Sequence, residues 1–205
     1  MKTLNSLLSH KLMALVRMDS KDKGQELADV LVAAGIKVIE ITLTTPGAEK
    51  IIEKLVKNKE LTVGAGTVLS TKDVKKAENA GAKFIVSPDT NEDVIKASKK
   101  LGLISMPGVA TASEVAIALD SGADVLKLFP ASTYGPSHLK ALRDPFPGNL
   151  WCPTGGITLG SVDDWFAAGA NLIGLGGPLT KGGLDKVNEN VIAFTNAVAR
   201  ANKVG

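Results

Sequence analysis

Apolar residues fall into short runs separated by longer amphipathic stretches, and glycine or proline marks most of the boundaries. The short runs predict strands at residues 12–17, 36–42, 61–65, 83–87, 103–106, 125–129, 150–153 and 172–175. Their centres lie about 19 to 25 residues apart, which fits a repeat of strand, turn, helix and turn. The runs are apolar at consecutive positions, as is typical of parallel strands buried on both faces. The pattern therefore predicts a parallel sheet built from eight βα units.

The longer stretches predict helices that cover this sheet. Residues 23–34 and 48–57 carry apolar side chains at helical spacing. Three more helices have N-capping residues before them and glycine at their ends, namely Ser70 and Thr71 before Gly81, Thr90 and Asn91 before Gly102, and Thr111 before Gly122.

Eight βα units close into a (β/α)8 barrel of the TIM type, an α/β fold that needs at least about 200 residues. The chain of 205 residues therefore predicts one barrel domain over residues 1–205. Residues 3–10 predict a short N-terminal helix that closes the bottom of the barrel. The alternative is an open, doubly wound sheet, which normally has about five to seven strands.

The composition argues against a nucleic-acid-binding, membrane-spanning or disulfide-bonded protein. A net charge of +3 and only 4% aromatic residues give little material for a nucleic-acid surface, so nucleic acid is not an expected partner. No stretch reaches the roughly 18 apolar residues of a membrane span, and no export signal is expected. The lone Cys152 excludes an intrachain disulfide. These features predict a cytoplasmic protein without a membrane partner.

Lys127 is the first candidate for chemistry, because polar residues late in barrel strands face the active site. It stands between large apolar residues in the predicted strand 125–129. A buried lysine tends toward its neutral amine, which is the nucleophile that forms a Schiff base with a ketone. The alternative is a lysine whose ammonium group reaches water at the barrel mouth.

Glu40 repeats this pattern between two isoleucines near the end of the predicted strand 36–42. Two buried opposite charges in one barrel are best explained by a common cavity. A carboxylate beside an imine-forming lysine moves protons to and from the substrate, directly or through a water. The alternative is an ion pair that only holds the barrel together.

Glycine-rich turns follow the third, seventh and eighth predicted strands, and barrels commonly bind phosphate with the loops after the last two. Backbone N–H groups and threonine hydroxyls in these turns predict a binding site for a phosphorylated substrate. The candidates are Thr67, Thr154, Gly155, Gly156, Gly176 and Gly177. Each turn taken alone is equally well explained as a tight turn.

Arg17 ends the first predicted strand and is the candidate for gripping a substrate carboxylate; the alternative is an ordinary surface arginine. The two histidines, His10 and His138, belong to no cluster with the spacing of metal ligands, so no metal site is expected.

Four strings lie in order on successive predicted strands: VIEIT at 38–42, GAGTV at 64–68, KLFPA at 127–131 and CPTGGI at 152–157. Together they resemble the 2-keto-3-deoxy-6-phosphogluconate (KDPG) aldolase and 4-hydroxy-2-oxoglutarate (KHG) aldolase family. The resemblance implies a homotrimeric class I aldolase on a (β/α)8 barrel that uses no metal or other cofactor.

The resemblance also assigns roles to the candidate residues. Lys127 would form the imine, Glu40 would relay protons, and Thr67 and Thr154 would line the pyruvate end. The phosphate would be held by Gly155, Gly156, Gly176 and Gly177. The residues packed around the imine would be Ser87, Pro88 and Phe129.

The chain departs from the family pattern at two positions. Thr44 stands where many members have an arginine for the substrate carboxylate, which leaves Arg17 for that task. Gly177 stands where members often carry a serine in the phosphate loop. The stretch YGPSH at 134–138 is similar to relatives that act on the galactonate epimer, so the sugar stays open.

The expected reaction is retro-aldol cleavage of KDPG to pyruvate and glyceraldehyde 3-phosphate. KHG is a further expected substrate, cleaved to pyruvate and glyoxylate. The rivals are an aldolase for the galactonate epimer, a metal-dependent pyruvate aldolase or phosphosugar isomerase on the same barrel, and a barrel that binds a sugar phosphate without turnover.

Overall fold

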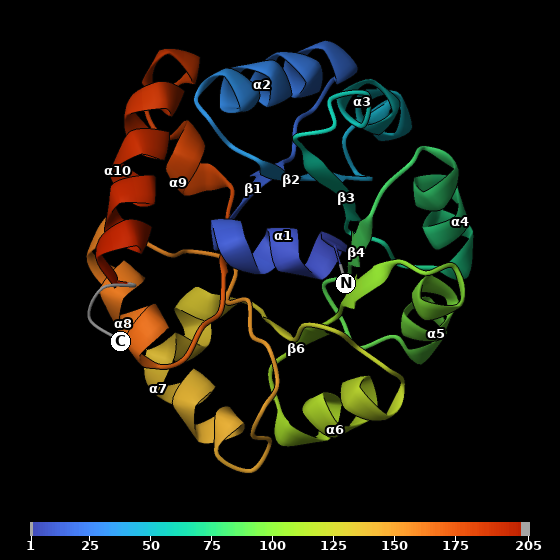
Figure 1. Cartoon of the computed structure of the whole chain (residues 1–205), viewed down its shortest axis with the longest axis vertical. Coiled ribbons are helices and arrows are strands. Elements are labelled where there is room, and N and C mark those ends of the chain that lie inside the picture. Colours follow the sequence, from blue (N-terminus) through green and yellow to red (C-terminus); the bar gives the residue numbers. More distant parts are fainter. Residues whose placement is uncertain (1, 202–205) are drawn as a thin grey trace.

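Parallel strands line the centre of the molecule and helices form a ring around them (Figure 1). The structure is a computed structural model that describes residues 2–201. One curled sheet has the strand order β5-β4-β3-β2-β1-β8, and β6 pairs with β7 in a second sheet. The strands are β1 (Leu12–Val16), β2 (Val38–Thr42), β3 (Thr62–Gly66), β4 (Phe84–Val86), β5 (Ile104–Met106), β6 (Gly108–Val109), β7 (Lys127–Leu128) and β8 (Ile173–Leu175).

The helices that follow the strands pack on the outside of the sheet. They are α2 (Lys21–Ala33), α3 (Ala48–Leu55), α4 (Thr71–Asn79), α5 (Glu92–Lys100), α6 (Ala112–Asp120), α7 (Ala131–Arg143), α8 (Val162–Ala167), α9 (Gly177–Thr180) and α10 (Val187–Ala201), with short 3-10 turns at Leu159–Ser161 and Leu184–Lys186. The side chains of Ser70, Asn91 and Thr111 accept hydrogen bonds from the first turns of α4, α5 and α6, which confirms the predicted caps.

The predicted α/β class and the parallel sheet are confirmed, but the described strands form a curled six-stranded sheet and a separate two-stranded pair, not a clearly closed eight-stranded barrel, and the strand predicted at 150–153 is wrong. Residues 150–153 form no regular strand; this segment makes the isolated bridges Leu126–Trp151 and Thr154–Gly174 and backbone hydrogen bonds to the residues on either side. Pro107 separates β5 from β6. Proline has no N–H group for the ladder, so Pro107 and Pro153 each interrupt regular pairing.

The described strands have an outer and an inner core. The outer cluster packs strand side chains such as Ile39, Leu126 and Ile173 against the ring of helices. The inner cluster fills the space enclosed by the strands and consists of Leu7, Met13, Val38, Phe84, Val86, Met106, Val125, Cys152 and Leu172. Both faces of the strands are thus buried, which explains their uninterrupted apolar sequences.

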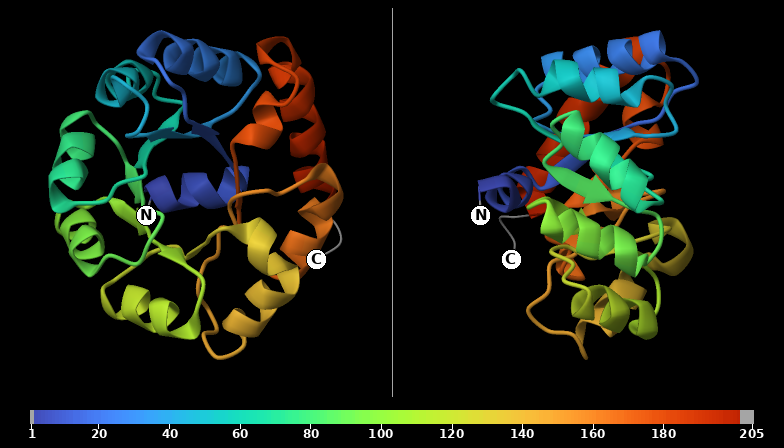
Figure 2. Two further views of the ribbon diagram at one scale, coloured as in Figure 1. Left: turned by 180° about the vertical axis from the view of Figure 1, so that it is seen from behind. Right: turned by 90° about the vertical axis from the view of Figure 1, so that its right-hand side faces the viewer.

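Helix α1 (Lys2–His10) closes one end of this inner core, as predicted for residues 3–10. It lies across one end of the curled sheet (Figure 2). Its Leu7 is fully buried in the inner cluster, and the Ser6 hydroxyl is 2.6 Å from the Thr62 hydroxyl of β3.

The inner cluster also determines where the polar strand residues point, because side chains two positions apart face the same side of a strand. Val38, Val125 and Cys152 lie inside. Two residues further along stand Glu40, Lys127 and Thr154, which therefore form the next layer toward the open, C-terminal end of the strands.

Candidate active site

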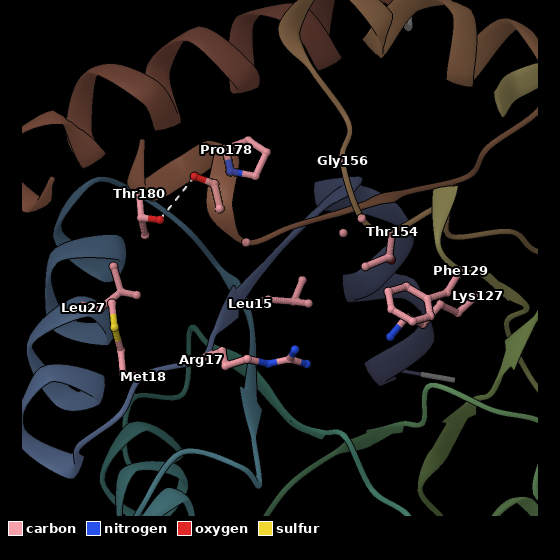
Figure 3. A pocket seen from close by; sticks show the side chains of 14 residues that line it. Leu15, Arg17, Met18, Leu27, Lys127, Phe129, Thr154, Gly156, Pro178 and Thr180 are labelled. Atoms are coloured by element: carbon pink, nitrogen blue, oxygen red, sulfur yellow. Dashed lines mark hydrogen bonds between the residues drawn. The ribbon is translucent and has the colours of Figure 1, made fainter. Parts of the chain in front are cut away.

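A cavity of about 350 Å³ opens at the C-terminal ends of the strands (Figure 3). It brings together most of the predicted site residues, namely Arg17, Lys127, Thr154, Gly155, Gly156, Gly176 and Gly177, with Phe129 beside them. Glu40, Thr67 and Pro88 are not among its lining residues. Thr67 contacts the lining residue Arg17, whereas Glu40 lies against Gly66 of β3 and the Pro88 carbonyl against Gly108 of β6.

Lys127 lies on β7 with only 5% of its surface exposed. Its Nζ is 4.7 Å from the centre of the Phe129 ring, close enough for a favourable cation–π contact when the amine is charged. Lys127 pairs in register with Gly108 of β6. A Cβ at Gly108 would lie 2.3 Å from the Pro88 carbonyl oxygen, so glycine lets the Pro88 loop approach the strand that pairs with β7.

Glu40 is 1% exposed, and its Oε2 has no hydrogen-bond partner. Burial raises the pKa of Glu40, while the positive charges of Lys127 and Arg17 oppose that rise. Among the described residues, no ion pair within 4.0 Å joins Glu40 to Lys127. Glu40 and Lys127 therefore do not form a salt bridge, and the Glu40 carboxyl group is left able to exchange a proton.

Glycine in β3 makes room for this carboxyl group. A Cβ at Gly66 would lie 1.7 Å from Oε1 of Glu40, far inside van der Waals contact. Gly66 belongs to the GAGTV string, one of the glycine-rich turns that the sequence predicts to lie at the substrate-binding site. Here the glycine instead accommodates a side chain of the neighbouring strand.

Arg17 and Thr67 meet at the mouth, where Nη2 of Arg17 donates a hydrogen bond to the Thr67 hydroxyl at 3.1 Å. Thr67 has a φ of 54°, which is rare for a β-branched residue. Such backbone strain is concentrated at functional sites. Arg17 is exposed on the cavity wall, so its guanidinium is accessible to a ligand.

Thr154 is buried, and its hydroxyl makes only long contacts, 3.4 Å to the Cys152 carbonyl and 3.7 Å to Cys152 Sγ. A Cβ at Gly174 would lie 2.4 Å from this hydroxyl, so glycine in β8 leaves it space. Burial raises the pKa of the Cys152 thiol to about 12, so the thiol beneath Thr154 is neutral. Since strong partners do not hold the Thr154 hydroxyl, it is free to turn toward a ligand.

Thr44, at the position of the family arginine, does not line the cavity. Its hydroxyl donates to Oγ1 of Thr42 at 3.1 Å, and the Thr42 hydroxyl donates to the Val16 carbonyl at 3.0 Å. These bonds tie the end of β2 to β1. Arg17 is then the one arginine among the lining residues.

His138 contacts other residues of the protein and does not line the cavity. Its Nε2 is 2.7 Å from the Ala110 carbonyl oxygen, and its ring stacks on Tyr134 with centroids 4.7 Å apart. Within residues 2–201, no three His, Cys, Asp or Glu side chains are grouped so that they could hold a metal ion. Over the same range, no helix has the length and apolar character to cross a membrane.

The sequence interpretation missed part of the cavity wall. Leu15, Met18, Leu27, Pro178 and Thr180 also line it. The sequence could have predicted Leu15, because it lies two residues before Arg17 and side chains two positions apart face the same side of a strand. The helical spacing of Leu27 predicts only that it faces the core, and nothing in the spacing of Met18, in a loop, or of Thr180, on α9, indicates which way these two face.

A sequence model of the family described as KDPG and KHG aldolase matches residues 4–194. The chain is 36% identical over 169 residues to the 2-dehydro-3-deoxy-phosphogluconate aldolase of Pseudomonas aeruginosa, covering 82% of this chain and 76% of the relative. It is 32% identical to the 2-dehydro-3-deoxy-6-phosphogalactonate aldolase of Escherichia coli, covering 93% of this chain and 95% of the relative.

Among solved structures, the KDPG aldolase of Legionella pneumophila, with pyruvate captured as a covalent carbinolamine intermediate, superimposes with a TM-score of 0.82 at 28% identity, covering 98% of each chain. The family match includes Glu40, Lys127 and Thr154. The chain therefore belongs to the KDPG and KHG aldolase family.

Proposed function

We propose that this protein is a class I aldolase that cleaves KDPG to pyruvate and glyceraldehyde 3-phosphate. KHG, which would give pyruvate and glyoxylate, is the proposed second substrate. The observation that carries this proposal is Lys127, a nearly buried amine on the wall of a cavity whose other polar groups suit an anionic keto acid. Family membership supports the same reaction class.

The reaction begins when the neutral amine of Lys127 attacks C2 of the keto acid. A proton from Glu40 lets the carbinolamine hydroxyl leave as water, and the protonated imine that remains withdraws electrons from C3. The C4 hydroxyl returns a proton to the Glu40 carboxylate, the C3–C4 bond breaks, and the aldehyde leaves behind an enamine on Lys127. Protonation at C3 and hydrolysis of the imine by water release pyruvate and restore the amine.

Glu40 is the proposed proton carrier for these steps. Burial raises its pKa, so it holds a proton to higher pH than an ordinary surface glutamate does. Because Glu40 does not line the cavity, a water molecule is the proposed bridge to C3. Arg17 would bind the carboxylate of the substrate, with Thr67 holding the guanidinium in place.

Other groups of the cavity would bind the rest of the substrate. Thr154 would hold the pyruvate portion, and Pro88 would pack near the imine. The N–H groups at Gly155, Gly156, Gly176 and Gly177 are the proposed phosphate ligands. Both Gly155 and Gly156 have positive φ, the conformation in which a glycine turn points backbone amides at an anion.

A second candidate substrate is the 6-phosphogalactonate epimer of KDPG. The YGPSH stretch and the galactonate aldolase that matches over 93% of this chain favour it. Both epimers require the same bond cleavage at Lys127, so the two candidates differ only in how the C4 hydroxyl is held.

A pyruvate-release assay on KDPG, its galactonate epimer and KHG, with EDTA present, tests these proposals. Activity is expected with wild type and loss of at least about 10³-fold with Lys127→Ala, because the nucleophile is removed. Borohydride with pyruvate should add mass at Lys127 and at no other lysine. Turnover in Lys127→Ala would overturn the mechanism, whereas trapping without release from any substrate would favour the non-catalytic binding barrel.

Three further features belong to the same proposal. The segment 150–154 is proposed to complete an eight-membered barrel, which its backbone hydrogen bonds to Leu126, Leu128 and Gly174 support. A cytoplasmic location and a homotrimeric state are proposed from the family resemblance. Sedimentation velocity tests the trimer.

A further inference from the structure

The polar side chains of the cavity are unevenly distributed. Among its lining residues, only Arg17, Lys127, Thr154 and Thr180 carry hydrogen-bonding side chains. Figure 3 shows Lys127 and Thr154 on one side, with the Arg17 guanidinium extending toward them. Thr180 lies on the opposite side, beyond Leu15 and close to the apolar side chain of Leu27.

The loop between β8 and α9 offers few other groups at that side. Gly176 and Gly177 have no side chains, and Pro178 has no N–H. The N–H of Leu179 already donates to the Gly176 carbonyl at 2.9 Å. The Thr180 hydroxyl is therefore the one side-chain donor that α9 presents to the cavity.

This hydroxyl is held beside the proposed phosphate turn. It donates to the Gly177 carbonyl at 3.2 Å, which is long for a hydrogen bond between oxygens. A hydroxyl proton rotates to suit its acceptor. A phosphate oxygen, being charged, is a stronger acceptor than a backbone carbonyl and would draw the proton away from Gly177.

We propose that Thr180 is the side-chain ligand of the substrate phosphate and sets the preference for phosphorylated over phosphate-free keto acids. This inference rests on the proposed aldolase function. One hydrogen bond to a charged group at a half-buried site corresponds to a change of about 10-fold in affinity. The effect belongs to the phosphate end, so it should appear in KM rather than in kcat.

The test compares Thr180→Val, which removes the hydroxyl but keeps the branched shape, with Thr180→Ser, which keeps the hydroxyl. Thr195→Val, at an exposed position on α10, is the matched control. The substrates are KDPG and phosphate-free 2-keto-3-deoxygluconate, and inorganic phosphate serves as a competitive inhibitor. Thermal unfolding midpoints are recorded for every variant.

Thr180→Val is expected to raise the KM for KDPG about 10-fold relative to the KM for 2-keto-3-deoxygluconate, and to weaken phosphate inhibition similarly. Thr180→Ser and Thr195→Val should resemble wild type. An unchanged ratio of KM values, or an equal loss with both substrates, would overturn the proposal.

Calorimetric titration with inorganic phosphate separates this inference from the aldolase function, because it requires no turnover. If wild type released no pyruvate, the proposed function would fail, and the titration would still decide the role of Thr180. Weaker phosphate binding by Thr180→Val than by Thr180→Ser supports it, and equal binding overturns it.

Discussion

Gly66→Ala offers a direct test of how Glu40 is positioned. The added Cβ would lie 1.7 Å from Oε1, 2.4 Å from Cδ and 2.6 Å from Cγ of Glu40. Ordinary contact begins at 3.4 Å, so the carboxyl group has to move by about 1.7 Å or β3 has to shift. Since Glu40 is 1% exposed, no open space receives a displaced side chain without further rearrangement.

The consequences for activity and stability follow from this displacement. A misplacement of about 1 Å in a reacting group costs roughly 10²-fold, and a positioned acid or base contributes about 10² to 10⁴. We therefore expect kcat for pyruvate release to fall about 10²-fold. Overpacking should also lower the free energy of unfolding by about 1–3 kcal/mol.

Pyruvate release and borohydride trapping together locate the defect. Trapping with pyruvate should still label Lys127 in Gly66→Ala, because the amine itself is not displaced. Gly160→Ala is the matched control, since its Cβ would meet no atom within 4 Å, and it should retain wild-type kcat. Wild-type kcat in Gly66→Ala would refute the placement of Glu40.

A double mutant provides a second, independent check. In a Glu40→Ala background the obstructing carboxyl group is absent, so adding Gly66→Ala should reduce kcat little further. A second loss of about 10²-fold in the double mutant would mean that Gly66 acts through something other than Glu40.

Two further predictions use the buried titratable groups. Burial raises the pKa of Glu40 above its ordinary 4.5, so the wild-type protein loses stability as pH rises from about 4.5 through the higher folded-state pKa and the buried carboxyl group becomes charged. Glu40→Gln stays neutral, so in urea unfolding it should gain free energy of unfolding relative to wild type as pH rises above about 4.5, and a pH-independent difference would contradict this. Cys152, with its pKa raised to about 12 and no exposed surface, should react with a disulfide reagent only in unfolded protein, so rapid labelling of the native state would count against the structure.

Much of the fold is predictable from the sequence because the strands are buried on both faces. Uninterrupted apolar runs such as 12–16 identify parallel strands, and capping residues such as Thr111 identify helix starts. Residues 150–153 have the same composition but form no regular strand. An apolar run reports burial, whereas ladder regularity depends on N–H groups that Pro153 lacks.

Strand periodicity predicts some residues of the site and not others. Lys127 and Glu40 are predictable because a charge inside an apolar strand has to face either the inner core or the helices, and both sides of the sheet are buried. Thr180 lies on a four-residue helix after a glycine turn. Its direction depends on how that turn folds, which no periodicity encodes.

The interior glycines link the packing of the fold to the polar groups of the site. Gly66 and Gly174 face Glu40 and Thr154 across neighbouring strands, and in both cases a Cβ would occupy the position of a side-chain oxygen. Packing alone would favour a larger apolar residue at such buried positions, since empty or polar-lined space costs stability. The chain instead combines glycine with a carboxyl group whose Oε2 has no partner. This combination places a polar group with an unpaired oxygen in the layer that contains Lys127, and the proposed proton transfer at Lys127 explains why a carboxyl group stands there instead of an apolar side chain.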